Sequence, residues 1–175
     1  MSQYDIDPAH SRAHFKVRHL MVSYVRGDFS KVSGSVTFDP SDLASAKLEA
    51  TIDATTINTS EPQRDAHLKS ADFLDTANFP TITFVSKSFA KTGADTLKVT
   101  GDLTIHGVTH EVVLNVEGPS DEVKDPWGNT KAGATATTKI NRKDFGLTWN
   151  QALETGGLLV GEDIAITLDV ELTRK

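Results

Sequence analysis

The chain has 175 residues and no cysteine, and its 18 basic and 24 acidic side chains give a net charge of −6. This length suits one domain, residues 1–175, with a sizeable core. The acidic balance argues against nucleic acid as a partner, because nucleic-acid-binding surfaces are usually basic. The lack of cysteine excludes a disulfide framework and cysteine-based zinc sites.

The N-terminal segment lacks the features of a secretion signal. MSQYDIDPAHSRAHF contains no apolar stretch and no small-residue cleavage site. No run elsewhere in the sequence is long and apolar enough to span a bilayer. We therefore expect no integral membrane segment and a cytoplasmic location. A periplasmic location is the alternative if a leader has been removed.

Alternation of apolar and polar residues is the dominant pattern, and it predicts strands. It recurs in eight segments, at residues 11–19, 34–39, 47–53, 81–84, 96–106, 111–117, 131–140 and 163–172. The apolar residues of each segment share one face, which is typical of antiparallel sheets with one solvated side. Short turns join the segments, such as HGVT at 106–109 and DPWGN at 125–129.

Eight antiparallel strands of this kind form a sandwich or a closed barrel. We predict an all-β fold, an eight-stranded antiparallel barrel, because several inward positions carry small side chains where a sandwich would carry Leu, Ile or Phe. These positions are Ala50, Gly101, Ala132, Ala134 and Ala136. A barrel of this size can hold one small ligand. The alternative is that the small residues taper a barrel filled by side chains.

The segment EPQRDAHLKSADFLDTANFP interrupts the alternation and predicts a short helical insert near residues 61–75. Ser60 is the expected N-cap, and Gln63 completes a capping-box pattern with it. Asp65 and Lys69 have the spacing of an ion pair along the helix.

One face of this helix combines apolar and charged residues. Leu68, Ala71 and Leu74 are spaced as one stripe, and Arg64 and His67 fall on the same stripe. A helix across a barrel end would direct both polar groups at the opening, where an arginine fork can grip phosphate or carboxylate. The alternative is structural, because an Arg–Asp pair can pin a helix across a barrel mouth without any ligand.

Six segments, in this order, resemble the YceI-like family of polyisoprenoid-binding proteins. They are DPAHSRAHFKVRHL, GDFSKVSGSVTFDP, RDAHLKSADFLD, FPTITFVS, VTGDLTIHGVTHEVVL and INRKDFGL, and they cover nearly the whole chain. The resemblance implies a lipocalin-like antiparallel barrel with an elongated apolar channel for a long isoprenoid or a similar amphiphilic lipid. It also implies a possible homodimer.

The family's patterns correspond to particular residues of this chain. They match His10, Phe15 and His19; Arg64, Asp65 and His67; Phe73 and Asp75; and Arg142, Asp144, Phe145 and Gly146. Leu74 departs from the pattern, because a second Phe is common there. Residues 109–112 also depart, since members often carry a basic residue and Pro at this turn.

We therefore predict a non-catalytic binding or carrier protein for an amphiphilic lipid. The resemblance favours a polyisoprenoid, such as an isoprenoid quinone or a prenyl phosphate, and a fatty-acid-like lipid is a further possibility. The predicted channel lining is Phe15, Val17, Phe38, Phe84, Val99, Leu103, Leu114 and Ile166. Arg64, His67 and His19 are predicted to contact the polar head. We expect no cofactor and no metal site, because the histidine pairs with zinc-like spacing fall on strands or turns.

Two other functions stay open at this point. One is an enzyme that acts on a lipid held in the same barrel, with His67 and Asp65 as an acid–base pair. The other is a filled barrel that serves in stress response or assembly.

Two further groups of charged residues favour structural interpretations. A row of cationic side chains faces away from the apolar side of the first predicted strand, and we interpret it as a solvated exterior. The row consists of Arg12, His14, Lys16 and Arg18. Contact with an anionic membrane is the minor alternative, weakened by the net negative charge. Arg142 and Asp144 are expected to form a loop-stabilising pair.

Overall fold

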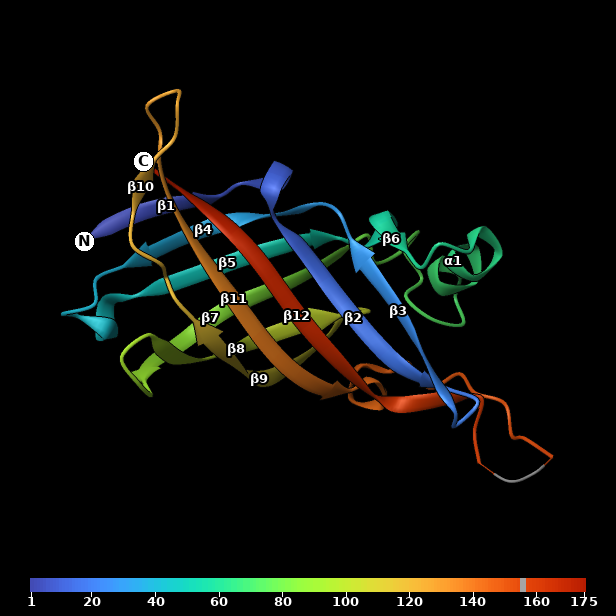
Figure 1. The fold of residues 1–175 in the computed structure, drawn as a ribbon. Helices are drawn as coiled ribbons and strands as arrows, with labels where there is room; N and C mark the ends of the chain where they lie inside the picture. The colour runs from blue at the N-terminus through green and yellow to red at the C-terminus, as the bar shows by residue number, and fades with distance from the viewer. Residues whose placement is uncertain (155–156) are drawn as a thin grey trace.

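The longest strand, β12 (Val160–Arg174), closes the sheet into a barrel. The computed structural model describes residues 1–154 and 157–175, and in it one edge of β12 pairs with β11 (Thr130–Asn141). The other edge pairs with β1 (Ser2–Ile6) and then with β2 (Arg12–His19), again antiparallel. Figure 1 shows β12 running the length of the barrel between these partners.

The rest of the ring runs from β1 back to β11 through antiparallel neighbours. Its strands are β4 (Val32–Phe38), β5 (Lys47–Asp53), β7 (Thr81–Lys91), β8 (Thr96–Ile105) and β9 (Val108–Glu117). The pairing order β11-β9-β8-β7-β5-β4-β1-β12, with β11 paired back to β12, makes a closed eight-stranded barrel. The predicted fold class is therefore confirmed.

The remaining elements extend or cap the ring. They are β3 (Ser23–Phe29), β6 (Ile57–Asn58), β10 (Val123–Lys124), α1 (Pro62–Lys69) and four 3₁₀ turns, η1 (Pro8–His10), η2 (Leu43–Ser45), η3 (Ala54–Thr56) and η4 (Arg142–Phe145). The strand β3 pairs with β2 and β6, and β10 pairs with β11. The ring still has eight strands because β1 and β2 follow one another along the same edge of β12. In the same way, β4 and β3 pair with β1 and β2 in turn.

Alternation located eight strands, but it missed β1, β3 and the two-residue strands β6 and β10, and it made β7 too short. The predicted segment for β7 ended at Phe84, whereas β7 continues to Lys91. An irregularity between Ser86 and Ser88 shifts the register by one residue, so the inward sequence changes from Phe84 to Phe89 and the simple period is lost.

The seam between β9 and β11 is short. These strands pair only through residues 115–117 and 135–137. Beyond that point, η4 lies beside both strands, and its Phe145 is buried with its ring 5.4 Å from that of His110. The packing of Phe145 against His110 therefore continues the barrel wall where the hydrogen bonds between β9 and β11 stop.

The predicted helical insert is confirmed, but its α-helix is shorter than the expected range. It ends at Lys69, and turns follow at residues 70–78. Leu68 packs against the core and Leu74 belongs to it, as the stripe predicted. Ala71 lies beyond the helix and is exposed, so its place on the stripe was wrong.

The start of the helix also differs from the expectation. Glu61 is the N-cap, and its carboxylate accepts a hydrogen bond from the backbone N–H of Gln63. Ser60 stands one residue earlier with a left-handed φ of 63°. Its side chain therefore does not cap the helix, although the capping box required it.

The hairpin between β2 and β3 turns at Leu20 and Met21. The N–H of Val22 donates to the carbonyl of His19, and both central residues have positive φ, 53° and 63°. This geometry usually carries Asn-Gly, and each side-chain-bearing residue in it costs about 1–2 kcal/mol. Backbone preference therefore does not explain two large apolar residues at this tip.

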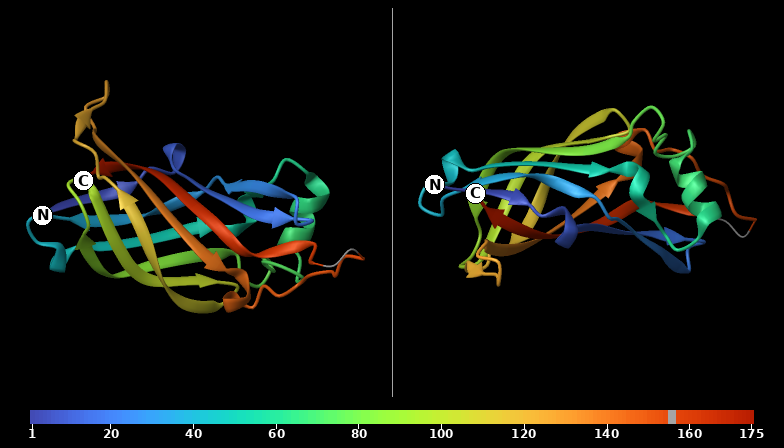
Figure 2. Two further views of the ribbon diagram at one scale, coloured as in Figure 1. Left: turned by 60° about the horizontal axis from the view of Figure 1, so that its bottom comes forward. Right: turned by 90° about the horizontal axis from the view of Figure 1, so that it is seen from above.

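The two ends of the barrel carry different structures. Both termini and β10 lie at one end, while α1, the β2–β3 hairpin and the segment before β12 lie at the other (Figures 1 and 2). Across residues 1–154 and 157–175, no helix combines the length and apolar character needed to cross a membrane.

A charged cluster joins η1 to the barrel wall. Lys131 Nζ lies 2.9 Å from Asp7 Oδ2 and 3.1 Å from Glu171 Oε1, and His10 Nδ1 lies 3.0 Å from Asp7 Oδ2. The Asp7 side chain is only 17% exposed. The hydrogen bond from Lys131, followed by that from His10, lowers the pKa of Asp7 from 3.8 to about 2.

Replacing Asp7 with Asn tests this cluster by the pH dependence of stability. A lowered folded-state pKa stabilises the protein above the unfolded pKa, and this contribution is lost as the pH falls from about 4 to about 2. Asp7→Asn should therefore cost about 2 kcal/mol in unfolding free energy at neutral pH and almost nothing near pH 2. Urea titrations across this range provide the measurement.

The matched control is Asp121→Asn, at an exposed position. It should track the wild type at every pH. A cost for Asp7→Asn that stays constant with pH would show that the ion pair is not the source of the stability.

Candidate functional site

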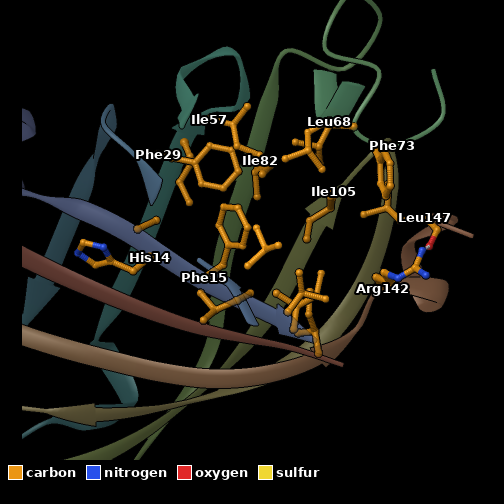
Figure 3. A pocket seen from close by; sticks show the side chains of 18 of the residues that line it. His14, Phe15, Phe29, Ile57, Leu68, Phe73, Ile82, Ile105, Arg142 and Leu147 are labelled. Atoms are coloured by element: carbon orange, nitrogen blue, oxygen red, sulfur yellow. Dashed lines mark hydrogen bonds between the residues drawn. The ribbon is translucent and has the colours of Figure 1, made fainter. Parts of the chain in front are cut away.

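The barrel interior contains a cavity of about 280 Å³ at the helix end. Inward side chains of the strands form its wall, and the segment after α1 adds a cover. Figure 3 shows Phe15 and Ile82 turned into this space, with Leu68 and Phe73 beside it. The wall is almost wholly apolar because alternation sends the polar half of each strand outward.

A second cavity, of about 100 Å³, lies toward the termini. Ala50, Phe84, Leu114 and Leu168 border both cavities, which are therefore adjacent within the barrel. A Cβ added at Gly101 would lie 2.5 Å from Phe84 Cζ, so this glycine makes room for the phenyl ring. Phe84 thus lies at the boundary between the two cavities, which we call the waist.

The small inward residues have different roles. Ala134 and Ala136 border the smaller cavity and Ala50 borders both, as expected of residues that leave room. Ala132 packs within the buried core. The space above Gly101 is occupied by Phe84 rather than left open.

The residues predicted to line a channel all border one or both cavities. Phe15, Val17, Leu103 and Ile166 border the larger one, Phe38 and Val99 the smaller one, and Phe84 and Leu114 both. His19, Arg64 and His67 also border the larger cavity, at its helix end, where they are half-buried. Contact of any of these residues with a ligand stays a prediction.

Arg64 holds the start of the helix to the preceding segment. Its Nε donates to Thr59 Oγ1 and its Nη2 donates to the Thr59 carbonyl, both at 2.8 Å. Asp65 accepts hydrogen bonds from the N–H and the hydroxyl of the same threonine. Asp65 therefore turns back to Thr59, and the expected pair between Asp65 and Lys69 was wrong.

His67 belongs to an aromatic cluster over the cavity. Its ring stands edge-on to Phe73 and Trp149, with centroids 5.0 and 4.9 Å away, and Phe73 and Trp149 are 5.2 Å apart. His67 Nε2 lies 2.9 Å from Asp72 Oδ2. The acid–base pair of His67 with Asp65 is not assembled, because each side chain has another partner.

Arg142 is the charged residue whose role the sequence misassigned. It is 2% exposed, and it donates to the carbonyls of Gly161, Leu147 and Trp149 at 2.6–2.8 Å, not to Asp144. It supports the loop before β12 by binding backbone rather than a carboxylate. Burial lowers the pKa of the Arg142 guanidinium, and the nearby Glu162 carboxylate opposes that effect. The side chain still carries its positive charge at neutral pH, as arginine does throughout proteins.

Trp149 is one of the lining residues that the sequence analysis did not predict. It lies in the loop held by Arg142, where no strand or helix period marks it. Leu147 of the same loop also borders the cavity and is buried. Only the position of this loop against the barrel end brings both residues to the site.

Comparisons with known proteins cover nearly the whole chain. A family model described as the YceI-like domain matches residues 4–172. A UPF0312 protein of Staphylococcus aureus (strain MSSA476) is 42% identical over 175 residues, which is 99% of this chain and 98% of that protein.

Two solved structures share the barrel. A Campylobacter jejuni YCEI protein aligns with a TM-score of 0.74 and 34% identity over 90% of each chain. A polyisoprenoid binding domain from Saccharophagus degradans aligns with a TM-score of 0.70 over 98% of each chain, and its 15% identity makes this a likeness of fold alone.

Truncating Arg142 should release the loop that carries Leu147 and Trp149 from the barrel end. Arg142→Ala leaves the carbonyls of Leu147, Gly161 and Trp149, which are buried or partly buried, without this donor, and a buried group left unpaired costs about 1–3 kcal/mol. We expect a loss of roughly 3 kcal/mol or more in unfolding free energy, measured by chemical denaturation. The neighbouring Lys143→Ala removes only a surface ion pair with Glu162 and should cost under about 1 kcal/mol. Equal costs for both variants would contradict the role of Arg142.

Proposed function

Because the chain belongs to the YceI-like domain family, we propose that it binds an amphiphilic lipid, a polyisoprenoid by preference, inside the barrel without altering it chemically. The observation that carries this proposal is the larger cavity, whose wall is apolar and which has Arg64, His67 and His19 at its helix end. The Saccharophagus degradans neighbour, described as a polyisoprenoid binding domain, supports the same ligand class.

The apolar wall supplies the affinity in this proposal. Each methylene removed from water contributes about 0.8 kcal/mol, so a tail of about 15 carbons contributes roughly 12 kcal/mol before costs. The free-energy cost of association and of ordering the tail offsets a large part of this contribution. Micromolar to nanomolar binding is attainable on these terms. A tail that passes Phe84 would occupy the smaller cavity too.

The helix end supplies orientation. Two N–H groups of Arg64 donate to Thr59. The other N–H groups of its guanidinium can donate to a phosphate or carbonyl oxygen. His67 and His19 are the other polar contacts proposed for the head group. The lipid would therefore lie with its head beneath α1 and its tail toward the termini.

The alternatives have less support. The enzyme hypothesis needed His67 and Asp65 to act together, and their partners are Asp72 and Thr59. The filled-barrel hypothesis is disfavoured by the two cavities. A homodimer and a cytoplasmic location stay predictions.

Comparing a phosphorylated and an unphosphorylated prenyl ligand tests the head-group site. After solvent extraction, with mass spectrometry of the extract, the protein is titrated calorimetrically with farnesyl phosphate and with farnesol. Arg64→Ala should weaken farnesyl phosphate about tenfold or more and leave farnesol nearly unchanged, because only the phosphate accepts a charge-assisted hydrogen bond.

Thr59→Val is the matched control, since it removes the hydroxyl that Arg64 and Asp65 bind while it keeps the Arg64 cation and its bond to the Thr59 carbonyl. It should change the affinity of both ligands equally and little. Equal weakening of both ligands by Arg64→Ala would mean that Arg64 only holds the helix to Thr59 and does not contact the head group. Failure of the wild type to bind either ligand would refute the cavity as a lipid site.

Filling the smaller cavity tests whether the tail extends past the waist. Ala136→Leu adds bulk there, so geranylgeraniol should lose about tenfold in affinity while geraniol is unaffected. Thr137→Leu, at the neighbouring exposed position of β11, is the control and should alter neither. Equal effects on both chain lengths would place the whole tail in the larger cavity.

A further inference from the structure

The tip of the β2–β3 hairpin exposes three consecutive apolar residues. Leu20, Met21 and Val22 are 41%, 51% and 76% exposed. Leu20 and Met21 hold left-handed backbone conformations that favour glycine or asparagine. Met21 lies beside Gly157, but much of the apolar surface of the three residues still faces solvent. Strained backbone at exposed apolar residues is typical of a contact outside the chain.

A cationic cluster lies directly behind this tip. Lys16 Nζ, Arg18 Cζ and Arg26 Cζ lie 5.0, 4.9 and 5.7 Å from the centre of the exposed Tyr24 ring. Within residues 1–154 and 157–175, none of the three cations forms an ion pair with a carboxylate. Arg18 donates instead to the Met21 carbonyl and so supports the tip.

The rest of the outward row is compensated, which makes the cluster distinct. Arg12 pairs with Asp28 at 3.0 Å, and His14 lies 3.6 Å from Asp169. The predicted solvated exterior therefore has two parts. Its far part lies beside acidic neighbours, whereas its part near the tip concentrates positive charge on a protein of net charge −6.

We propose that residues 16–26 dock this end of the barrel onto a bilayer that contains anionic lipid. Apolar side chains at a tip, an amphipathic Tyr and a group of basic residues behind them match the layers of a membrane interface: acyl boundary, headgroup and phosphate. The negative charge elsewhere on the chain is repelled by the same surface and orients the molecule with the hairpin toward it.

The docking end is also the cavity end. Arg18 and His19 of the hairpin border the larger cavity, and the Leu20 N–H donates to the carbonyl of Leu159, another residue of its wall. A lipid could therefore leave the bilayer beside the cavity and avoid water. Docking goes beyond the proposed lipid binding and needs no lipid in the barrel, so the two proposals can fail separately.

Vesicle co-sedimentation tests the proposal. The wild type should bind vesicles of equal parts phosphatidylglycerol and phosphatidylcholine at low salt, and bind pure phosphatidylcholine far more weakly. High salt should weaken the binding because it screens exposed charges. Lys16→Gln/Arg26→Gln should lower partitioning about tenfold or more, since each basic residue near an anionic surface contributes about fivefold. Val22→Ser should lower it roughly fivefold or more by removing apolar insertion.

Two control variants at the opposite end make the assignment specific. Lys47→Gln/Lys98→Gln removes two exposed lysines, and Trp127→Ser removes a side chain that is 84% exposed. Both should sediment like the wild type. The proposal is overturned if the wild type ignores anionic vesicles or if the controls lose as much binding as the hairpin variants. It is also overturned if Val22→Ser changes only the oligomeric state in gel filtration, since the tip would then contact a second copy.

Discussion

Closure of the sheet through β12 is the constraint on which the rest of the structure depends. Once β12 pairs with β11 on one edge and with β1 and β2 on the other, the ring fixes how wide the interior is, whatever side chains face it. The sizes of the inward residues then decide between a packed core and a hollow. Phe84 against Gly101 fills the middle, whereas Ala134 and Ala136 leave space on one side of it. The two cavities are therefore a consequence of ring geometry combined with residue volume.

The helix end is held by side chains that bind main-chain groups. Loops that cross an apolar interior must satisfy their own carbonyls and amides, because water does not reach them there. Arg142 provides this for the segment before β12, and Arg64 with Asp65 provides it for Thr59 before the helix. Charged residues thus position the cover of the cavity, and Phe73 and Trp149 can pack over apolar space as a result.

Much of the fold was predictable because alternation with period two is a local signal. It located eight strands and the correct face of each, including Phe15 on β2 and Leu103 on β8. It failed where the period is broken, at the irregularity after Ser86, and where a strand is short, as in β1. Partners of charged side chains were less predictable. Asp65 and Arg142 both bind groups that the loops bring near, and no spacing along the sequence encodes those approaches.

Both termini emerge at the end of the barrel farthest from α1 and the β2–β3 hairpin (Figure 1). An affinity tag, a fluorophore or a surface tether joined to either one would leave the opposite pole unobstructed. Molecules immobilised in this way would all present the same pole to the surrounding solution. The chain is thus suited to sensors and oriented films in which a uniform display of one face matters.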